Sequence, residues 1–227
     1  MSIDAVLFDF SGTLFRLEET AWSLGGFTDS GGEPFDVAAQ AEIMRRMTAP
    51  SGQVVELEPE YVEAWEKRDL DPVLHRKVYL EVLRRSGLTV REQAEELYGR
   101  LIDPACWTPY PDTAGVLRGL RAAGVPVAVI SNIAFDIRPA FTELGVAEDV
   151  DEFLLSFEEG MIKPDPAVFR LACERLGVAP ERALMIGDSE EADGGAAALG
   201  CRVELVQPLP TDERPDALRA AVAGLLA

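Results

Sequence analysis

The stretch that decides the fold lies at residues 5–14 and reads Ala5-Val6-Leu7-Phe8-Asp9-Phe10-Ser11-Gly12-Thr13-Leu14. A short, continuously apolar run is typical of a strand that is buried on both faces of a parallel sheet. A carboxylate, Asp9, follows the run directly, and Gly12 allows the chain to turn tightly soon after it. Ligands of open parallel sheets bind at the carboxyl ends of the strands, so Asp9 is the first candidate functional residue.

Similar apolar runs recur along the rest of the chain. The clearest are residues 125–130 and 183–186, and weaker ones are 153–155 and 203–206. Helical spacing of apolar residues separates or follows these runs, over residues 112–123, 166–176, 190–199 and 215–226. The alternation of strands and helices predicts an α/β sandwich built on a parallel sheet.

Residues 16–107 have a different pattern, without a clear strand run. Helical spacing is found over residues 35–47, 59–67, 72–85 and 89–102, and residues 25–32 look like a loop. The simplest organisation is a catalytic core of residues 1–15 and 108–227, with a helical cap domain of residues 16–107 inserted after the first strand. A chain of 227 residues has room for both.

Composition narrows the classes of partner. The formal net charge of −19 repels a nucleic-acid backbone and anionic membrane surfaces, and no apolar run approaches the roughly 18 residues of a membrane helix. The N-terminus lacks the basic region of a signal peptide. We therefore expect a soluble, cytoplasmic monomer or homodimer. The only histidine, His75, lies in a helical stretch, which favours a surface or interhelical role over catalysis.

Polar residues follow the predicted strands in a suggestive order. Ser131 and Asn132 follow the second strong run, Asp188 follows the third with Asp193 shortly after, and Lys163 precedes a helix. At one sheet edge these groups would suit phosphoryl transfer. Free aspartate titrates near roughly 3.9, so we expect an ionised Asp9 that can attack phosphorus. Neighbouring carboxylates beside a phosphate need a hard cation such as Mg²⁺, and a lysine and a hydroxyl can hold phosphoryl oxygens.

These segments resemble the four motifs of the haloacid dehalogenase-like (HAD) superfamily. Asp9 to Thr13 matches the nucleophile loop, Ser131 the second motif, Lys163 the third, and Gly187-Asp188 with Asp193 the acidic fourth. The resemblance spans the chain from Asp9 to Asp193. It implies a Rossmann-like three-layer α/β/α sandwich, and residues 16–107 look like the C1-type helical cap of subfamily I.

The resemblance also implies roles for individual residues. Asp9 would be the nucleophile and a Mg²⁺ ligand, with the backbone carbonyl of Ser11 and the side chain of Asp188 as further ligands. Asp193 would order the outer shell of the metal or the lysine. Ser131, Asn132 and Lys163 would hold the phosphate of a small phosphorylated metabolite, and Lys163 would also take part in catalysis.

One position departs from the family pattern. Phosphatases of the superfamily usually carry a second aspartate two residues after the nucleophile, as an acid and base, and this chain has Ser11 there. General acid–base catalysis contributes roughly 10²–10⁴-fold, so turnover of poor leaving groups should be slow. Three hypotheses stay open: a phosphatase, a catalytically silent protein that binds a phosphorylated ligand or a protein, and a dehalogenase or phosphonate hydrolase.

Overall fold

The computed structural model describes residues 2–18, 21, 23–29, 31–47 and 55–226. Its main sheet has five strands in the order β5-β4-β1-β6-β7, all parallel. The strands are β1 (Ala5–Phe8), β4 (Val127–Ser131), β5 (Glu152–Leu155), β6 (Ala183–Gly187) and β7 (Arg202–Leu205). All five runs that the sequence predicted as strands are therefore confirmed, and so is the α/β class.

Strand β1 lies at the centre of the sheet, between β4 and β6. Its four residues are fully buried, and they alternate between the two faces, as successive side chains of a strand must. Val6 and Phe8 belong to one hydrophobic cluster and Leu7 to a second one. Burial on both faces explains why the strand reads as a continuous apolar run.

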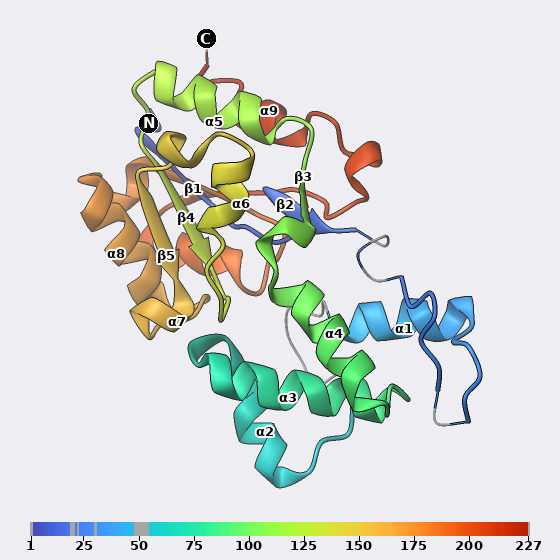
Figure 1. The fold of residues 1–227 in the computed structure, drawn as a ribbon. Helices are drawn as coiled ribbons and strands as arrows, with labels where there is room; N and C mark the ends of the chain where they lie inside the picture. The colour runs from blue at the N-terminus through green and yellow to red at the C-terminus, as the bar shows by residue number, and fades with distance from the viewer. Residues whose placement is uncertain (1, 19–20, 22, 30, 48–54, 227) are drawn as a thin grey trace.

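Helices cover both faces of this sheet (Figure 1). The cluster of Val6 and Phe8 includes residues of α5 (Thr113–Ala122), α6 (Arg138–Glu143) and α9 (Ala217–Ala221). The cluster of Leu7 includes residues of α8 (Pro166–Leu176) and of the 3₁₀ segment η6 (Asp193–Leu199). The short helix α7 (Ser156–Glu159) follows β5 directly. The result is the expected three-layer sandwich.

The predicted insert is helical where the structure describes it. It contains α1 (Val37–Met47), α2 (Pro59–Glu66), the 3₁₀ turn η2 (Arg68–Leu70), α3 (Pro72–Arg85) and α4 (Arg91–Ile102). These elements lie beyond the carboxyl ends of β4 and β5 (Figure 1). We call residues 16–107 the cap segment, and their division from the core as a separate domain stays our proposal.

A two-stranded antiparallel sheet joins the two ends of the cap segment, which the sequence did not predict. Strand β2 (Phe15–Leu17) pairs with β3 (Trp107–Pro109). Three residues are too few for a period-2 pattern to be recognised. The buried ring of Phe10 packs against the rings of Phe15 and Trp107, and the ring centroids are 5.0 Å apart in each pair. Aromatic packing therefore fixes this two-stranded sheet against the chain just after Asp9.

Two predicted helices are shorter than expected. The predicted helix 190–199 is a 3₁₀ segment from Asp193. Its Gly195 lies against the loop before α8, where a Cβ would come within 2.6 Å of the Pro164 carbonyl oxygen. The last helix is limited to α9. In the described residues, none of the helices is long and apolar enough to cross a membrane.

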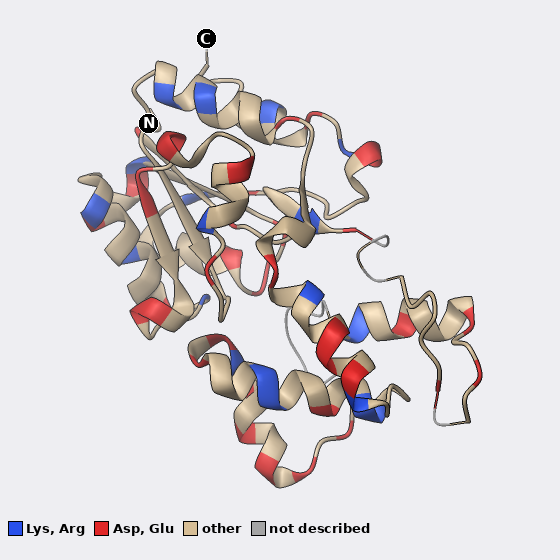
Figure 2. Cartoon of the chain, viewed as in Figure 1, with Lys and Arg blue, Asp and Glu red and all other residues tan. Residues whose placement is uncertain are grey.

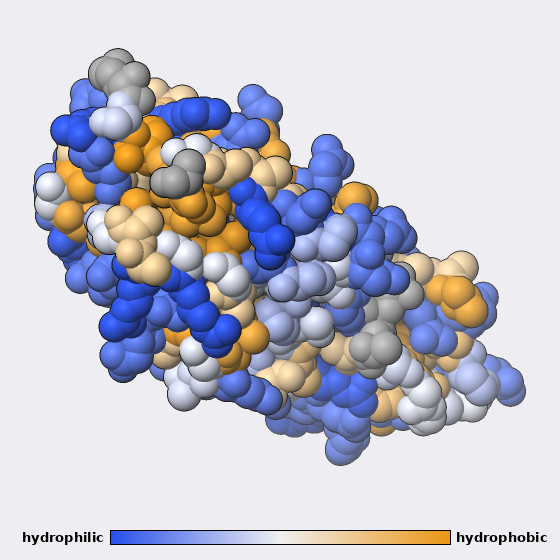
Figure 3. All heavy atoms as spheres, turned by 90° about the horizontal axis from the view of Figure 1, so that it is seen from above, coloured by the Kyte–Doolittle hydropathy of each residue, from blue (hydrophilic) through white to orange (hydrophobic). Residues whose placement is uncertain are grey.

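The charges of the cap segment are largely paired. Figure 2 shows acidic and basic residues side by side on its helices, and Glu42 and Glu81 each accept hydrogen bonds from two arginines. Such pairs stabilise a surface helix by about 0.3–0.5 kcal/mol each. The face seen in Figure 3 mixes hydrophilic and apolar patches. Neither glutamate lines the cavity described below, so these pairs serve the helices rather than the site.

Candidate active site

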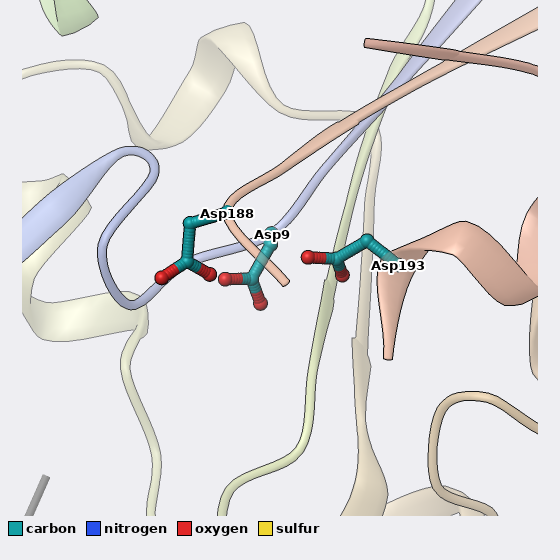
Figure 4. Close-up of side chains that lie close together, drawn as sticks. All are labelled: Asp9, Asp188 and Asp193. Atoms are coloured by element: carbon teal, nitrogen blue, oxygen red, sulfur yellow. The ribbon is translucent and has the colours of Figure 1, made fainter. Parts of the chain in front are cut away.

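Three aspartates meet at the carboxyl edge of the central strands. Asp9 follows β1, Asp188 follows β6, and Asp193 begins η6. Each offers a carboxylate oxygen, and these three oxygens lie within 4.8 Å of one another. Asp9 lies between the other two, with its carboxylate beside theirs (Figure 4). The sequence-based expectation that Asp9 and Asp188 lie side by side is thus confirmed in geometry.

Lys163 links two of these carboxylates. Its Nζ atom donates hydrogen bonds to Asp9 Oδ1 and to Asp193 Oδ1, both at 2.6 Å. The lysine side chain is only 3% exposed. Asp193 also accepts a hydrogen bond from the backbone N–H of Ser189 at 3.0 Å. Asp193 is thus held in place by two donors, and it orients the lysine toward Asp9.

Burial dominates the electrostatics of this cluster. It raises the pKa of Asp9 to about 8, where Lys163 lowers that pKa and Asp193 and Asp188 raise it. Burial also raises the pKa of Asp188 to about 6. Burial alone would lower the pKa of Lys163, but the two carboxylates outweigh it and hold that pKa above its ordinary value. Burial therefore opposes the predicted ionisation of Asp9, and the ammonium group of Lys163 favours it.

Two glycines let the carboxylates come this close. Gly12 adopts a φ of +74°, and a Cβ there would lie 2.4 Å from Asp188 Oδ2. A Cβ on Gly187 would lie 2.0 Å from Asp193 Oδ2. Any larger residue would displace a carboxylate, so the two glycines shape the acidic cluster.

The lysine loop is held by Asn132. The Asn132 side-chain amide donates to the Lys163 carbonyl oxygen at 2.9 Å, and its Oδ1 accepts from the Lys163 backbone N–H at 2.8 Å. Asp165 then caps α8, whose first residue is Pro166. Asn132 therefore positions Lys163, and its predicted contact with phosphate stays a prediction.

Arg214 is a site residue that the sequence did not indicate. It is 4% exposed, its guanidinium lies 3.1 Å from the ring centroid of Tyr110, and it donates to the carbonyl oxygens of Gly12 and Thr13. It thereby anchors the loop after Asp9 from the far end of the chain. Only the fold brings these residues together, because they are about 200 positions apart.

A cavity of about 140 Å³ opens between the acidic cluster and the cap segment. Its core side carries Asp9, Ser11, Asp188, Ser131 and Lys163. Its cap side is mostly aromatic or apolar and includes the residues Met47, Arg68, Asp69, His75, Tyr79, Leu101 and Trp107. Among these residues, Arg68 is 7% exposed, and its guanidinium stacks 4.2 Å above the Trp65 ring.

His75 is buried between two cap helices. This is the interhelical role, one of the two roles that the sequence favoured. It is 3% exposed, and its Nδ1 lies 2.9 Å from the hydroxyl oxygen of Tyr98 on α4. Burial, with a smaller contribution from Arg68, lowers the pKa of His75 to about 3. The ring is therefore neutral at physiological pH.

This burial predicts a measurable pH dependence of stability. The pKa of His75 is about 3 in the folded protein against an ordinary 6.5, so the unfolded chain binds a proton that the folded one refuses. Its contribution to stability is present above about pH 6.5 and is lost as the pH falls toward 3. The unfolding free energy of the wild type should decrease when the pH is lowered from about 7 to 4. In His75→Phe this decrease should be smaller by about 2–3 kcal/mol, because the variant has no imidazole.

Urea unfolding at several pH values checks this prediction. The chain has one histidine, so no other imidazole contributes to the difference. Tyr98→Phe is the matched control: it removes the hydroxyl beside His75 and keeps the imidazole, so its curve should shift without changing slope. Parallel curves for the wild type and His75→Phe would contradict the assignment.

The donor set fits a divalent cation. Three carboxylates and one ammonium group leave the cluster with two negative charges when all are ionised. Hard oxygen ligands are those that Mg²⁺ prefers, usually with one or two protein carboxylates. A cation would also keep Asp9 and Asp188 ionised, because it opposes the effect of burial on their pKa.

Comparisons with known proteins agree with this geometry. Residues 3–200 match the family described as haloacid dehalogenase-like hydrolase. The phosphoserine phosphatase of Thermus thermophilus is 34% identical over 144 residues, which are 62% of this chain and 57% of that protein. The (S)-2-haloacid dehalogenase 1 of a Pseudomonas species is 35% identical over 107 residues, 46% of this chain and 47% of that protein.

A solved dehalogenase structure has the same fold. Its TM-score is 0.71 at 23% identity, and the match covers 100% of this chain and 98% of the other. The chain spans about half the length of the curated relatives that it matches. Its relatives thus include both phosphatases and dehalogenases. The family match covers most of the chain, so the chain belongs to the haloacid dehalogenase-like hydrolases.

Proposed function

We propose that this protein is a Mg²⁺-dependent phosphatase that acts on a small phosphorylated metabolite of the cytoplasm. The observation that carries the proposal is the acidic cluster of Asp9, Asp188 and Asp193 around Lys163. Lys163 offsets one of the three negative charges, and the remaining two need a cation. Without a cation, these charges would disfavour binding of an anionic substrate. The phosphatases among the relatives support the same choice.

The residues would divide the chemistry as follows. Asp9 attacks phosphorus and carries the phosphoryl group as an aspartyl-phosphate. Asp9, Asp188 and the backbone carbonyl of Ser11 would hold Mg²⁺, which neutralises charge on the phosphoryl oxygens. Lys163, buried and held by Asp193, donates hydrogen bonds toward those oxygens, and the buried hydroxyl of Ser131 lines the same cavity.

A haloacid dehalogenase is the second candidate. The aromatic and apolar residues on the cap side of the cavity, the serine at position 11 and relatives such as the Pseudomonas dehalogenase favour it. Asp188 opposes it, because a second carboxylate beside Asp9 repels the carboxylate of a 2-haloacid. A catalytically silent binding protein, the remaining hypothesis, would keep the site without turnover.

One assay separates these functions. We expect phosphate release from p-nitrophenyl phosphate when Mg²⁺ is present, loss of that release in EDTA with recovery on adding Mg²⁺, and no halide release from (S)-2-chloropropionate. The activated leaving group needs little protonation, so Ser11 does not limit this substrate. Halide release without Mg²⁺ would support the dehalogenase. Release of neither product would support the silent protein and contradict our proposal.

A further inference from the structure

Phosphoester hydrolysis needs a proton at the leaving oxygen, and among the described residues the core side of the cavity offers no free acid for it. The Ser11 hydroxyl does not ionise near neutral pH. Lys163 is committed to Asp9 and Asp193 at 2.6 Å each. In the proposed phosphatase function, on which this inference rests, Asp9 and Asp188 serve the phosphoryl group and the cation. Another group must therefore move this proton.

The cap side of the cavity carries four ionisable side chains among the described residues, namely Arg68, Asp69, His75 and Tyr79. Arg68 is excluded, because an arginine side chain does not serve as an acid or base in proteins. The imidazole of His75 lies against Tyr98 and stays neutral, since burial lowers its pKa to about 3. Burial raises the pKa of Tyr79 further from neutrality. Asp69 is the group left that can both give and take a proton.

Asp69 is tied to the core at the right place. It belongs to the turn η2, and its carbonyl oxygen accepts a hydrogen bond from the Ser156 hydroxyl at 2.5 Å. The Ser156 oxygen in turn accepts from the backbone N–H of Ile133 at 2.8 Å, two residues after Ser131. The contact joins the cap segment to the loop that follows β4. It fixes the backbone of Asp69, a residue that lines the same cavity as Asp9.

We propose that the carboxyl group of Asp69, carried to the cavity by the cap segment, is the acid and base of the reaction in place of a core aspartate. As Asp9 attacks phosphorus, the bond between phosphorus and the ester oxygen breaks, and that oxygen keeps the electron pair and takes the proton of Asp69. The Asp69 carboxylate then takes a proton from water as the water oxygen attacks the phosphorus of the aspartyl-phosphate. The bond between phosphorus and the Asp9 oxygen breaks, and its electron pair stays with Asp9, which is again a carboxylate. Inorganic phosphate is released, and Asp69 is protonated again.

The surroundings of Asp69 suit both steps. Burial raises the pKa of its carboxyl to about 6, and the neighbouring Arg68, whose guanidinium lies 3.6 Å away, opposes this only in part. The side chain is 16% exposed, so water can reach it. A group with a pKa near neutrality is populated in both forms at working pH, which is the optimum for proton transfer.

The neighbouring elements present neutral or paired groups to Asp69. From α3 it faces the neutral His75 and Tyr79. Lys67, the residue directly after α2, pairs with Glu63 of α2 at 2.7 Å. In α7, Glu158 pairs with Arg138 and Glu159 with Arg175. Arg68 and burial are the influences that set the protonation of Asp69.

Asp69→Asn tests the assignment with two substrates that differ in leaving group. We expect kcat/KM for an alkyl phosphate, such as propyl phosphate, to fall by about 10²–10⁴-fold. For p-nitrophenyl phosphate, whose leaving group needs no proton, kcat/KM should change by less than about threefold. Its burst of p-nitrophenol should grow, because the second step slows. Asp69→Glu should recover part of the alkyl phosphate activity.

Two further measurements separate chemistry from structure. For the wild type with propyl phosphate, kcat/KM should fall as the pH rises through about 6, and Asp69→Asn should lack this limb. Glu66→Gln, which removes an exposed carboxylate of the same segment, should leave both substrates unaffected. Equal losses for both substrates, or no loss for either, would refute the role of Asp69 and leave the phosphatase proposal standing. Absence of Mg²⁺-dependent aryl phosphate hydrolysis in the wild type would refute both.

Discussion

Replacing Asp9 with asparagine should abolish hydrolysis of p-nitrophenyl phosphate, with a fall in kcat of about 10⁴-fold or more. The amide is nearly isosteric with the carboxylate but cannot attack phosphorus. Removal of the nucleophile of a protease lowers kcat by about 10⁶-fold. Asp9 also accepts the 2.6 Å hydrogen bond from Lys163, which an amide oxygen still accepts more weakly. Steady-state phosphate release with saturating Mg²⁺ checks this prediction.

The fold of Asp9→Asn should survive the change. Burial and the nearby carboxylates of Asp193 and Asp188 raise the pKa of Asp9, so the folded protein disfavours a charge at this position and should tolerate a neutral amide. Unfolding by urea should therefore show equal or higher stability than in the wild type without Mg²⁺. Asp212→Asn, at an exposed aspartate away from the cavity, is the matched control and should stay fully active. If the kcat of Asp9→Asn were within tenfold of the wild-type value, the role of Asp9 would be contradicted. A tenfold change corresponds to only about 1.4 kcal/mol in activation free energy.

Replacing Lys163 with methionine should have the largest effect on stability. The ammonium is buried, and it offsets two buried carboxylates at 2.6 Å each. Removal of one partner from a buried pair costs about 3–5 kcal/mol, because the other charge stays without compensation. At neutral pH we expect a loss of that size in the unfolding free energy, and a fall in kcat of about 10²–10³-fold from the loss of a donor to the phosphoryl oxygens.

A double variant separates the two effects. Lys163→Met with Asp193→Asn removes a carboxylate that the lysine no longer offsets, so a large part of the stability should return. Activity should not return, because the donor to the phosphoryl group is still missing. If Lys163→Met alone were as stable as the wild type at neutral pH, the buried pair would not have the energetic weight that its geometry implies.

The sheet could be predicted from sequence because its strands are buried on both faces. Continuous apolar runs mark β1, β4 and β6, and glycines mark the ends of helices such as α8, whose Gly177 adopts a φ of 69°. The pairing of β2 with β3 could not be predicted in this way, because strands of three residues are too short to show a period. The close approach of Gly195 in η6 to Pro164 could not be predicted either, because these residues are 31 positions apart and are brought together only by the fold.

The core of the site could be predicted because each residue directly follows a strand or precedes a helix. Asp9, Asp188 and Lys163 converge for that reason, and Asp193 joins them. Residues that reach the site through tertiary contacts gave no local signal: Arg214 comes from the end of the chain, and Asp69 from a turn between two cap helices. The ordinary pKa of aspartate could not foretell the upward shift in the pKa of Asp9, since burial depends on the whole fold.

The central claim, that Asp9 carries the phosphoryl group, is tested most directly by trapping the intermediate. The wild type is mixed with p-nitrophenyl phosphate and Mg²⁺, quenched in acid within the first turnover, digested, and analysed by mass spectrometry. We expect the mass of one phosphoryl group on the peptide that contains Asp9, and none on that peptide in Asp9→Asn. Full turnover with no phosphoryl adduct at any quench time, or an adduct on a different residue, would contradict the account.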